Sequence, residues 1–322
     1  MDPRRTRPYA ANKMKLPQIL ILIVIAVFVA SDTAPQATHK ILDDEFGEGF
    51  ASLRTEHWVI HYSTTDEQAR QVGETLEKTR TIFIETFARV GIELEEQTPV
   101  LTCELYKDSE SYRDHMKSIG NPRGAPSFGW YSTGTNRLTL IEPEIDDVMG
   151  LKVSLVWTAA HEGAHQLSFN LGLLQRGRNY PPWLLEGVAG AFETDDPKVE
   201  FGPFSGYVTQ KVRIIREYVE RSDHAPLLEL SAMRRTPSSS LRDRFENVPK
   251  KRVQIYAQGA SLAIYLITHR PEGFKTYLQN LTSASSSGTA SNRWRTAFQD
   301  AFGDINALES DWKRWLLELD PN

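Results

Sequence analysis

The stretch His161-Glu162-Gly163-Ala164-His165 carries the pattern H-E-x-x-H in a run of apolar and small residues. Apolar residues recur at helical spacing from position 153 to 167, and Gly172 is placed to end that helix. Positions i and i+4 lie on one face of a helix, so both imidazoles can reach one metal ion. Glu162 lies one residue round the helix, within reach of a water molecule beside that metal. These are the requirements of zinc-dependent hydrolysis: two nitrogen ligands, an open coordination position and a carboxylate base.

Two histidines on a helix can also be ordinary core or surface residues, but a second segment offers a third ligand. That segment reads Pro181-Pro182-Trp183-Leu184-Leu185-Glu186-Gly187-Val188-Ala189-Gly190-Ala191-Phe192-Glu193. Its prolines are typical of a helix start. Glu186 follows His165 by 21 positions, enough for one helix to end and a second to return a ligand. Glycine inside a helix costs up to about 1 kcal/mol relative to alanine, so the glycines of both segments indicate either a close approach that brings Glu186 to the metal or ordinary tight packing.

These motifs resemble those of the gluzincin metallopeptidases, in which the histidines of H-E-x-x-H and a glutamate of the next helix bind zinc. Residues 183–189 read W-L-L-E-G-V-A and are similar to the W-x-x-E-G-x-A segment of the aminopeptidase-like gluzincins. Tyr256-Ala257-Gln258-Gly259 is similar to that group's Y-x-x-G helix, whose tyrosine stabilises the tetrahedral intermediate. The resemblance covers roughly residues 125 to 320 and is closest to bacterial peptidase-MA-like families.

The resemblance implies an α+β, zincin-like metallopeptidase that hydrolyses peptide bonds. His161, His165 and Glu186 would hold zinc, with a water molecule in the fourth position. Glu162 would act as the general base and Tyr256 would donate a hydrogen bond to the oxyanion. From pattern alone, Tyr256 could instead be a core residue of an amphipathic helix.

Glu193 is a further candidate for the metal site. It follows Glu186 by seven residues and is expected on the same helix face, where it could orient a ligand histidine. A solvated surface glutamate is the alternative.

One segment departs from the family pattern. Gluzincin aminopeptidases carry an upstream G-x-M-E-N segment whose glutamate holds the free amine of the substrate. The comparable residues here are Ser127-Phe128-Gly129-Trp130-Tyr131-Ser132, without Met-Glu-Asn. We therefore expect an enzyme that is not a typical aminopeptidase. Two alternatives are a non-catalytic zinc-binding domain and a cell-surface interaction domain, but a purely structural zinc site would need neither Glu162 nor Tyr256.

The composition is that of an ordinary globular protein, with 40% hydrophobic and 25% charged residues among 322. The formal net charge of −5 gives no electrostatic reason to expect nucleic-acid binding. The resemblance to the metallopeptidases implies a peptide or protein substrate as the partner. The one cysteine, Cys103, cannot form an intrachain disulfide, and its expected place in a strand favours a buried structural thiol.

Residues 1–30 have the features of an export segment. Five basic residues precede the apolar run Ile19 to Ala30, whose 12 residues are fewer than the ~20 of a membrane span. The positive flank predicts an extracytoplasmic protein, secreted or periplasmic. Because Phe28 is bulky for a cleavage site after Ala30, residues 16–30 are either a cleaved signal peptide or an anchor that holds the protein to the membrane.

The remaining chain divides into a polar linker at 31–44, an N-terminal α/β portion at 45–150 and a mostly helical, zinc-binding catalytic portion at 151–322. The expected elements are strands at 58–62 and 100–106, helices at 66–89 and 109–117, a β-hairpin at 129–142, helices at 210–221 and 253–268, a polar loop at 282–292 and a final helix pair. By the resemblance, the strand just before the metal helix edges a cleft where an extended peptide could add as a strand; a plain sheet strand is the alternative.

Overall fold

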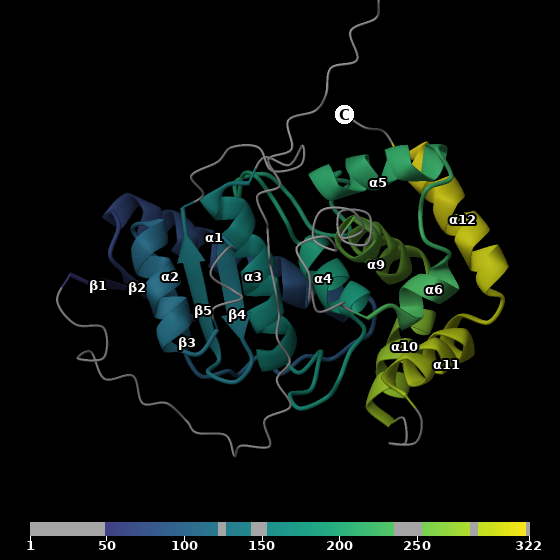
Figure 1. Ribbon diagram of the computed structural model, residues 1–322, viewed down its shortest axis with the longest axis horizontal. Coiled ribbons are helices and arrows are strands. Elements are labelled where there is room, and N and C mark those ends of the chain that lie inside the picture. The colour runs from purple at the N-terminus through teal and green to yellow at the C-terminus, as the bar shows by residue number, and fades with distance from the viewer. Residues whose placement is uncertain (1–48, 122–126, 143–152, 235–252, 284–288, 320–322) are drawn as a thin grey trace, which may run out of the picture.

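The computed structural model describes residues 49–121, 127–142, 153–234, 253–283 and 289–319. The predicted export segment at 1–30 and the linker at 31–44 lie outside these residues. Within the described ranges, no helix is long and apolar enough to cross a membrane. The fold is mixed α+β, with a small N-terminal sheet and a mostly helical C-terminal half, as Figure 1 shows.

The sheet has five strands in the order β1-β2-β3-β5-β4. The strands are β1 (Ala51–Arg54), β2 (Trp58–Tyr62), β3 (Leu101–Tyr106), β4 (Gly129–Ser132) and β5 (Arg137–Ile141). Strands β2, β3 and β5 run parallel, while β1 and β4 pair antiparallel at the two edges. The predicted strands and hairpin are confirmed, and β1 is an addition that the sequence pattern did not indicate.

Helices cover both faces of this sheet. They are α1 (Asp66–Arg89) and α3 (Leu155–Asn170) on one face and α2 (Ser109–Ser118) on the other. A capping box between Thr65 and Gln68 begins α1, and Gly91, with a φ of 71°, follows its end. The bounds of α1 therefore match the predicted ones. Cys103 is buried in the core, and burial raises the pKa of its thiol well above the usual range, which suits a structural residue.

Helix α3, which carries the H-E-x-x-H motif and is called the metal helix below, lies at the centre of the molecule. Ser154 caps its N-terminus, so the helix begins later than the apolar run at 151, and its residues from Leu155 to Phe169 are all buried. A helix that is buried on every side must be covered by several elements. Here α1, α4 and the β4–β5 hairpin supply that cover.

The hairpin corrects one expectation about the cleft edge. Strand β5, which directly precedes the metal helix in the sequence, lies inside the sheet, and β4 occupies the edge. The chain reverses through Asn136, whose φ of 58° is a conformation that asparagine tolerates. The Asn136 carboxamide also accepts hydrogen bonds from the Tyr131 hydroxyl (2.9 Å) and from Asn170 at the end of α3 (2.8 Å). The turn is thereby held to the end of the metal helix.

The other helices of the described residues belong to the C-terminal half. They are α4 (Pro182–Gly190), α5 (Gln210–Glu220), α6 (Leu227–Ala232), the π-helical turn η2 (Gln254–Gln258), α9 (Gly259–His269), α10 (Pro271–Ser283), α11 (Ala290–Phe302) and α12 (Ile305–Glu318). The predicted polar loop at 282–292 is too long at both ends. Helix α10 runs to Ser283, and Thr289 caps α11; residues 284–288 lie outside the described part.

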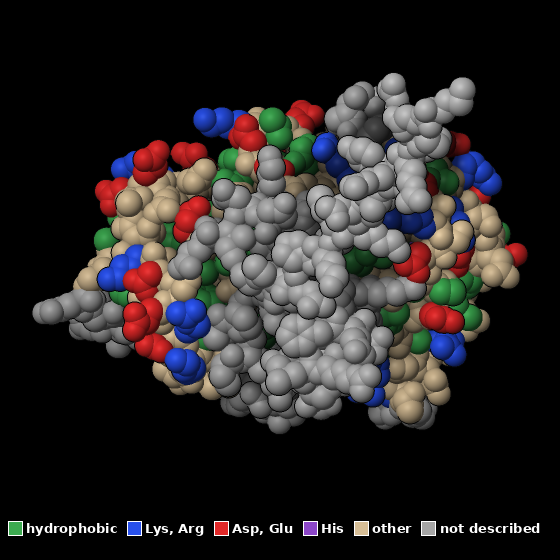
Figure 2. Space-filling view, turned by 45° about the horizontal axis from the view of Figure 1, so that its top comes forward, with side chains coloured by type: hydrophobic (Ala, Val, Ile, Leu, Met, Phe, Trp, Pro, Cys, Tyr) green, Lys and Arg blue, Asp and Glu red, His purple; other side chains and the backbone are tan. Residues whose placement is uncertain are grey.

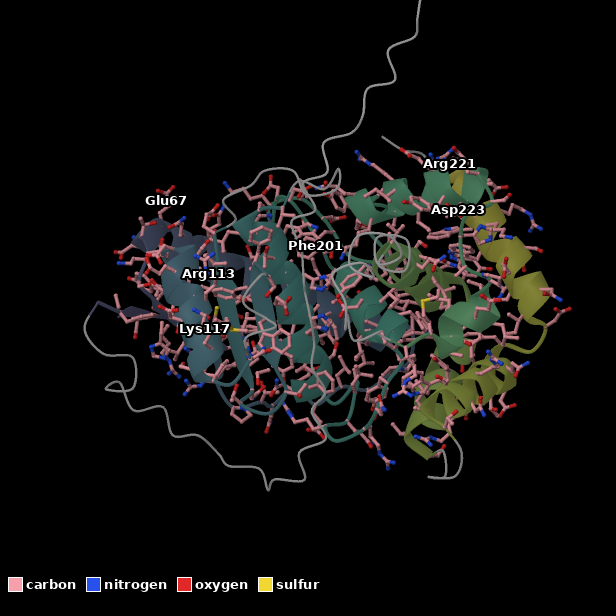
Figure 3. All side chains as sticks on the ribbon, viewed as in Figure 1. Glu67, Arg113, Lys117, Phe201, Arg221 and Asp223 are labelled. Carbon is pink, nitrogen blue, oxygen red and sulfur yellow. The ribbon has the colours of Figure 1, made fainter. Side chains whose placement is uncertain are left out.

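The surface carries charges of both signs. On the face in Figure 2, acidic and basic side chains of the described residues are interspersed. Figure 3 shows exposed Glu67, Arg113 and Lys117 over the sheet half, and Arg221 at the helical half. The side chains that could bind a metal ion lie instead in the interior, where α3 meets α4.

Candidate metal centre

The two predicted histidine ligands and the predicted glutamate ligand come together in a buried cluster. The His161 Nε2 atom lies 3.3 Å from Glu186 Oε2, and the His165 Nε2 atom lies 3.6 Å from the same oxygen. The two imidazole rings are nearly perpendicular, at 84°, with centroids 4.8 Å apart. One ligand atom from each residue lies within 4.8 Å of the other two, so this cluster could hold a metal ion. The donor set of two nitrogens and one oxygen fits a site that keeps a coordination position open.

The chain between the two helices explains how Glu186 returns to the histidines. Helix α3 ends at Asn170, and Gly172 adopts a φ of 78° that lets the chain turn. Pro181 then precedes α4, and Pro182 occupies its first turn, where no backbone N–H is required. Because Gly172 turns the chain after α3 and the two prolines begin α4, Glu186 in the second turn of α4 lies against α3.

The glycines do allow close approach, but between other helices than expected. A Cβ on Gly163 would lie 2.6 Å from Leu76 Cδ2, so this glycine admits α1 to the metal helix. A Cβ on Gly187 would overlap the carbonyl oxygen of Gly259, and one on Gly259 would lie 2.8 Å from the carbonyl oxygen of Trp183. The W-x-x-E-G-x-A and Y-x-x-G motifs are thus packed backbone to backbone, and α3 meets α4 without help from these glycines.

Glu193 contacts the metal cluster, although not from the predicted position. Helix α4 ends at Gly190, so Glu193 lies beyond the helix and not on its face. From there its Oε1 atom lies 2.6 Å from His161 Nδ1, on the side of the ring opposite the metal-facing Nε2. A carboxylate in this position fixes the orientation and tautomer of a ligand histidine. Burial raises the pKa of Glu193 to about 7, against the lowering effects of Lys211 and the Trp157 indole.

The side chain of Glu162 extends from the metal helix, α3, toward the edge strand β4. A Cβ on Gly129 of β4 would lie 2.7 Å from Glu162 Cγ and 2.6 Å from Thr158 Cγ2. Glycine at this position therefore lets the strand come close to the carboxylate side chain. The phenol of Tyr112 is near as well: burial raises its pKa, the Ser127 hydroxyl opposes that rise, and the negative charge of Glu162 adds to it.

Tyr256 is placed on the π-helical turn η2, which directly precedes α9. Such turns are common at functional sites because they reorient one side chain within a helix. Its ring is partly exposed and its centroid lies 5.4 Å from Lys211 Nζ. Since Lys211 also contacts Glu193, a chain of contacts links Tyr256 to His161.

Three residues near the cluster are absent from the sequence-based site. Trp157 stacks on His161, with centroids 5.7 Å apart and an interplanar angle of 14°, and its i, i+4 spacing could have indicated this contact. Lys211 and Tyr112 are brought in by α5 and α2. No local pattern connects those helices with the motif, so the sequence offered no comparable signal for them.

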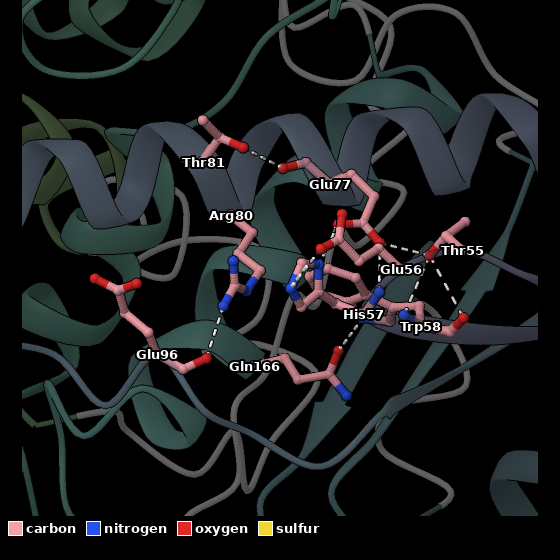
Figure 4. Close-up of polar contacts among 9 residues, drawn as sticks. All are labelled: Thr55, Glu56, His57, Trp58, Glu77, Arg80, Thr81, Glu96 and Gln166. Carbon is pink, nitrogen blue, oxygen red and sulfur yellow. Dashed lines mark hydrogen bonds and ion pairs between the residues drawn. The ribbon is translucent and has the colours of Figure 1, made fainter.

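Gln166, the residue after His165, ties the metal helix to the sheet. Its amide oxygen accepts a hydrogen bond from Trp58 Nε1 at 2.8 Å, as drawn in Figure 4. Its amide nitrogen donates to the carbonyl oxygens of Thr102 (3.2 Å) and Asn136 (3.0 Å). One buried carboxamide therefore connects α3 with β2, β3 and the hairpin turn.

We expect Gln166→Met to lower the free energy of unfolding by about 1–3 kcal/mol, because the buried Trp58 N–H loses its partner. Chemical denaturation measures this change. Gln175→Met, at an exposed position, is the matched control and should stay within about 0.5 kcal/mol of the parent. Equal midpoints for all three proteins would show that these hydrogen bonds do not stabilise the fold.

The fold and the cluster together define an α+β protein with a buried His-His-Glu group suited to a metal ion. A family model described as "Protein of unknown function (DUF1570)" matches residues 155–286. The matched range runs from the start of α3 into the segment after α10, so it contains the metal cluster, Glu193, Lys211 and Tyr256. No curated protein matches the chain.

Proposed function

We propose that this protein is an exported, zinc-dependent metallopeptidase of the gluzincin type with a zincin-like fold, and that it is not a typical aminopeptidase. The observation that carries the proposal is the convergence of His161 Nε2, His165 Nε2 and Glu186 Oε2 in one buried cluster. Glu162 adjoins the first of these ligands on the same helix, which is the position that a general base requires.

The donor set suggests the role of the metal, and the resemblance to the gluzincins suggests the roles of Glu162 and Tyr256. Zinc bound by this set would polarise a peptide carbonyl and lower the pKa of a water molecule toward about 7. Glu162 would serve as the general base beside that site, able to take a proton from water and to pass it to the leaving amine. Tyr256 donates a hydrogen bond to the oxyanion, and Glu193 holds the ring of His161.

The edge strand supports a peptide as the substrate. Strand β4 is at the edge of the sheet, and its first residue, Gly129, packs against Glu162. An extended peptide that pairs with an exposed sheet edge gains main-chain hydrogen bonds without regard to its side chains. Bound there, a peptide would run past the carboxylate that acts as base.

The parent protein tests this proposal. We expect about one zinc ion per chain, from the one three-ligand cluster among the described residues, and cleavage products from a peptide library. Metal analysis and mass spectrometry of the digest provide the two measurements. A protein that binds zinc and cleaves no member of a broad library would favour a non-catalytic zinc-binding domain.

Export is a separate prediction from residues 1–30. The basic flank and the short apolar run predict that the residues after about position 30 lie outside the cytoplasm. Cell fractionation and intact-mass measurement on material from the native host distinguish a cleaved signal peptide from an anchor. A full-length, soluble product in the cytosol would contradict the prediction.

A further inference from the structure

Lys211 occupies a position that elementary electrostatics disfavours. It lies in the first turn of α5, where the helix dipole is unfavourable for a cation, and its side chain is only 3% exposed. A buried ammonium group is costly unless it has close partners. The residue is therefore expected to have a specific role beyond helix formation.

The amine of Lys211 contacts three side chains, from three different elements. It forms an ion pair with Glu193 Oε1. It also lies 4.9 Å from the ring centroid of Trp157 and 5.4 Å from that of Tyr256, both within the range of cation–π attraction. One cation therefore connects the segment after α4, the metal helix α3 and the π-helical turn η2.

Two of these contacts lead directly to His161. The Oε1 atom of Glu193 that pairs with Lys211 is also the atom that lies 2.6 Å from His161 Nδ1. The Trp157 ring that faces Lys211 stacks on the His161 imidazole. The imidazole is thus held at its edge by one partner of Lys211 and at its face by another.

We propose that Lys211 is a positioning residue of the metal centre, which orients His161 through Glu193 and Trp157 and holds the Tyr256 ring beside the same site. The role toward His161 concerns metal binding alone, whereas the role toward Tyr256 rests on the proposed function. Metal affinity therefore tests the inference independently of any peptidase activity.

The first experiment compares zinc affinity in the full chain by competition with a chelator. Lys211→Met keeps the length of the side chain and removes its charge, and we expect zinc affinity to fall by roughly 10–100-fold, as for other lost supports of a ligand histidine. Arg213→Met removes an exposed cation two residues further along α5 and should change affinity by no more than about twofold. Cobalt(II) in place of zinc should show shifted visible absorption bands only in Lys211→Met.

A double variant tests whether the effect passes through Glu193. If it does, the losses do not multiply, and Lys211→Met combined with Glu193→Gln binds zinc about as tightly as Glu193→Gln alone. The double variant also removes both buried charges, so it supplies the comparison if Lys211→Met alone fails to fold. Losses that multiply would overturn the route through Glu193, and a folded double variant with parental affinity would overturn the proposal as a whole.

The outcomes separate this inference from the proposed function. Parental zinc affinity and cobalt spectrum in a folded Lys211→Met protein would overturn the positioning role and leave the metallopeptidase proposal standing. A parent protein that binds no zinc would overturn both.

Discussion

Glu162→Gln is expected to keep about one zinc ion per chain and to lose roughly 10²–10⁴-fold in peptide turnover. The carboxamide has the shape of the carboxylate, but it cannot accept the proton that a general base must take. Glu162 is assigned as the base because His161, His165 and Glu186 form the cluster that could hold the metal ion and would supply its three protein ligands. Turnover of a library-derived peptide and metal content of the same sample are the measurements.

Two further variants accompany this comparison. Tyr256→Phe should also keep zinc and lose roughly 10²–10³-fold in turnover, the effect of a lost oxyanion donor. Glu217→Gln, at an exposed position on α5, is the matched control and should behave as the parent. Parental turnover in Glu162→Gln would rule out the proposed hydrolytic mechanism and favour a non-catalytic zinc-binding domain.

Glu186→Ala is expected to lose zinc and activity together. Glu186 Oε2 is the oxygen that faces both histidine Nε2 atoms, and its removal leaves a two-ligand site. His161→Ala and His165→Ala should have the same result, in contrast to Glu162→Gln. Zinc content after dialysis against a weak chelator measures the loss.

The control for the ligand series is Glu229→Ala, which removes a carboxylate from α6 outside the cluster. It should retain the parental zinc content. Full zinc retention in Glu186→Ala and in both histidine variants would show that the ion binds elsewhere.

Local signals in the sequence were sufficient wherever a feature depends on neighbours along the chain. The spacing of His161 and His165 places both rings on one face of α3 because a helix returns to the same face after four residues. The bounds of α1 could be predicted because capping groups and a terminating glycine lie next to the helix in sequence. Glu186 could be identified because its motif resembles a known segment, and the structure brings it to the histidines.

Other features depend on contacts between distant parts of the chain, and only the tertiary structure decided them. Strand order placed β4 at the edge and β5 inside, although both belong to one hairpin. Gly163 lets α1 approach and Gly187 lets α9 approach, because a glycine in the sequence indicates a close contact but not which helix makes it. Helix α4 ends before Glu193, so the carboxylate reaches His161 from the irregular segment that follows the helix.

The contacts of Lys211 are another feature of the site that could not be predicted from local sequence and depends on the tertiary structure. In sequence it is one of many lysines, and its position in the first turn of a helix gives no hint of a metal centre 50 residues earlier. Folding places its amine against Glu193, Trp157 and Tyr256 at once. The sequence by itself therefore indicated which side chains could bind a metal, because the spacing of His161 and His165 is local and Glu186 lies in a motif that resembles a known segment. The packing of α5 on η2, from which Lys211 reaches Trp157 of α3, decided which side chains support them, because a buried charge acts on whatever the fold brings within a few ångströms.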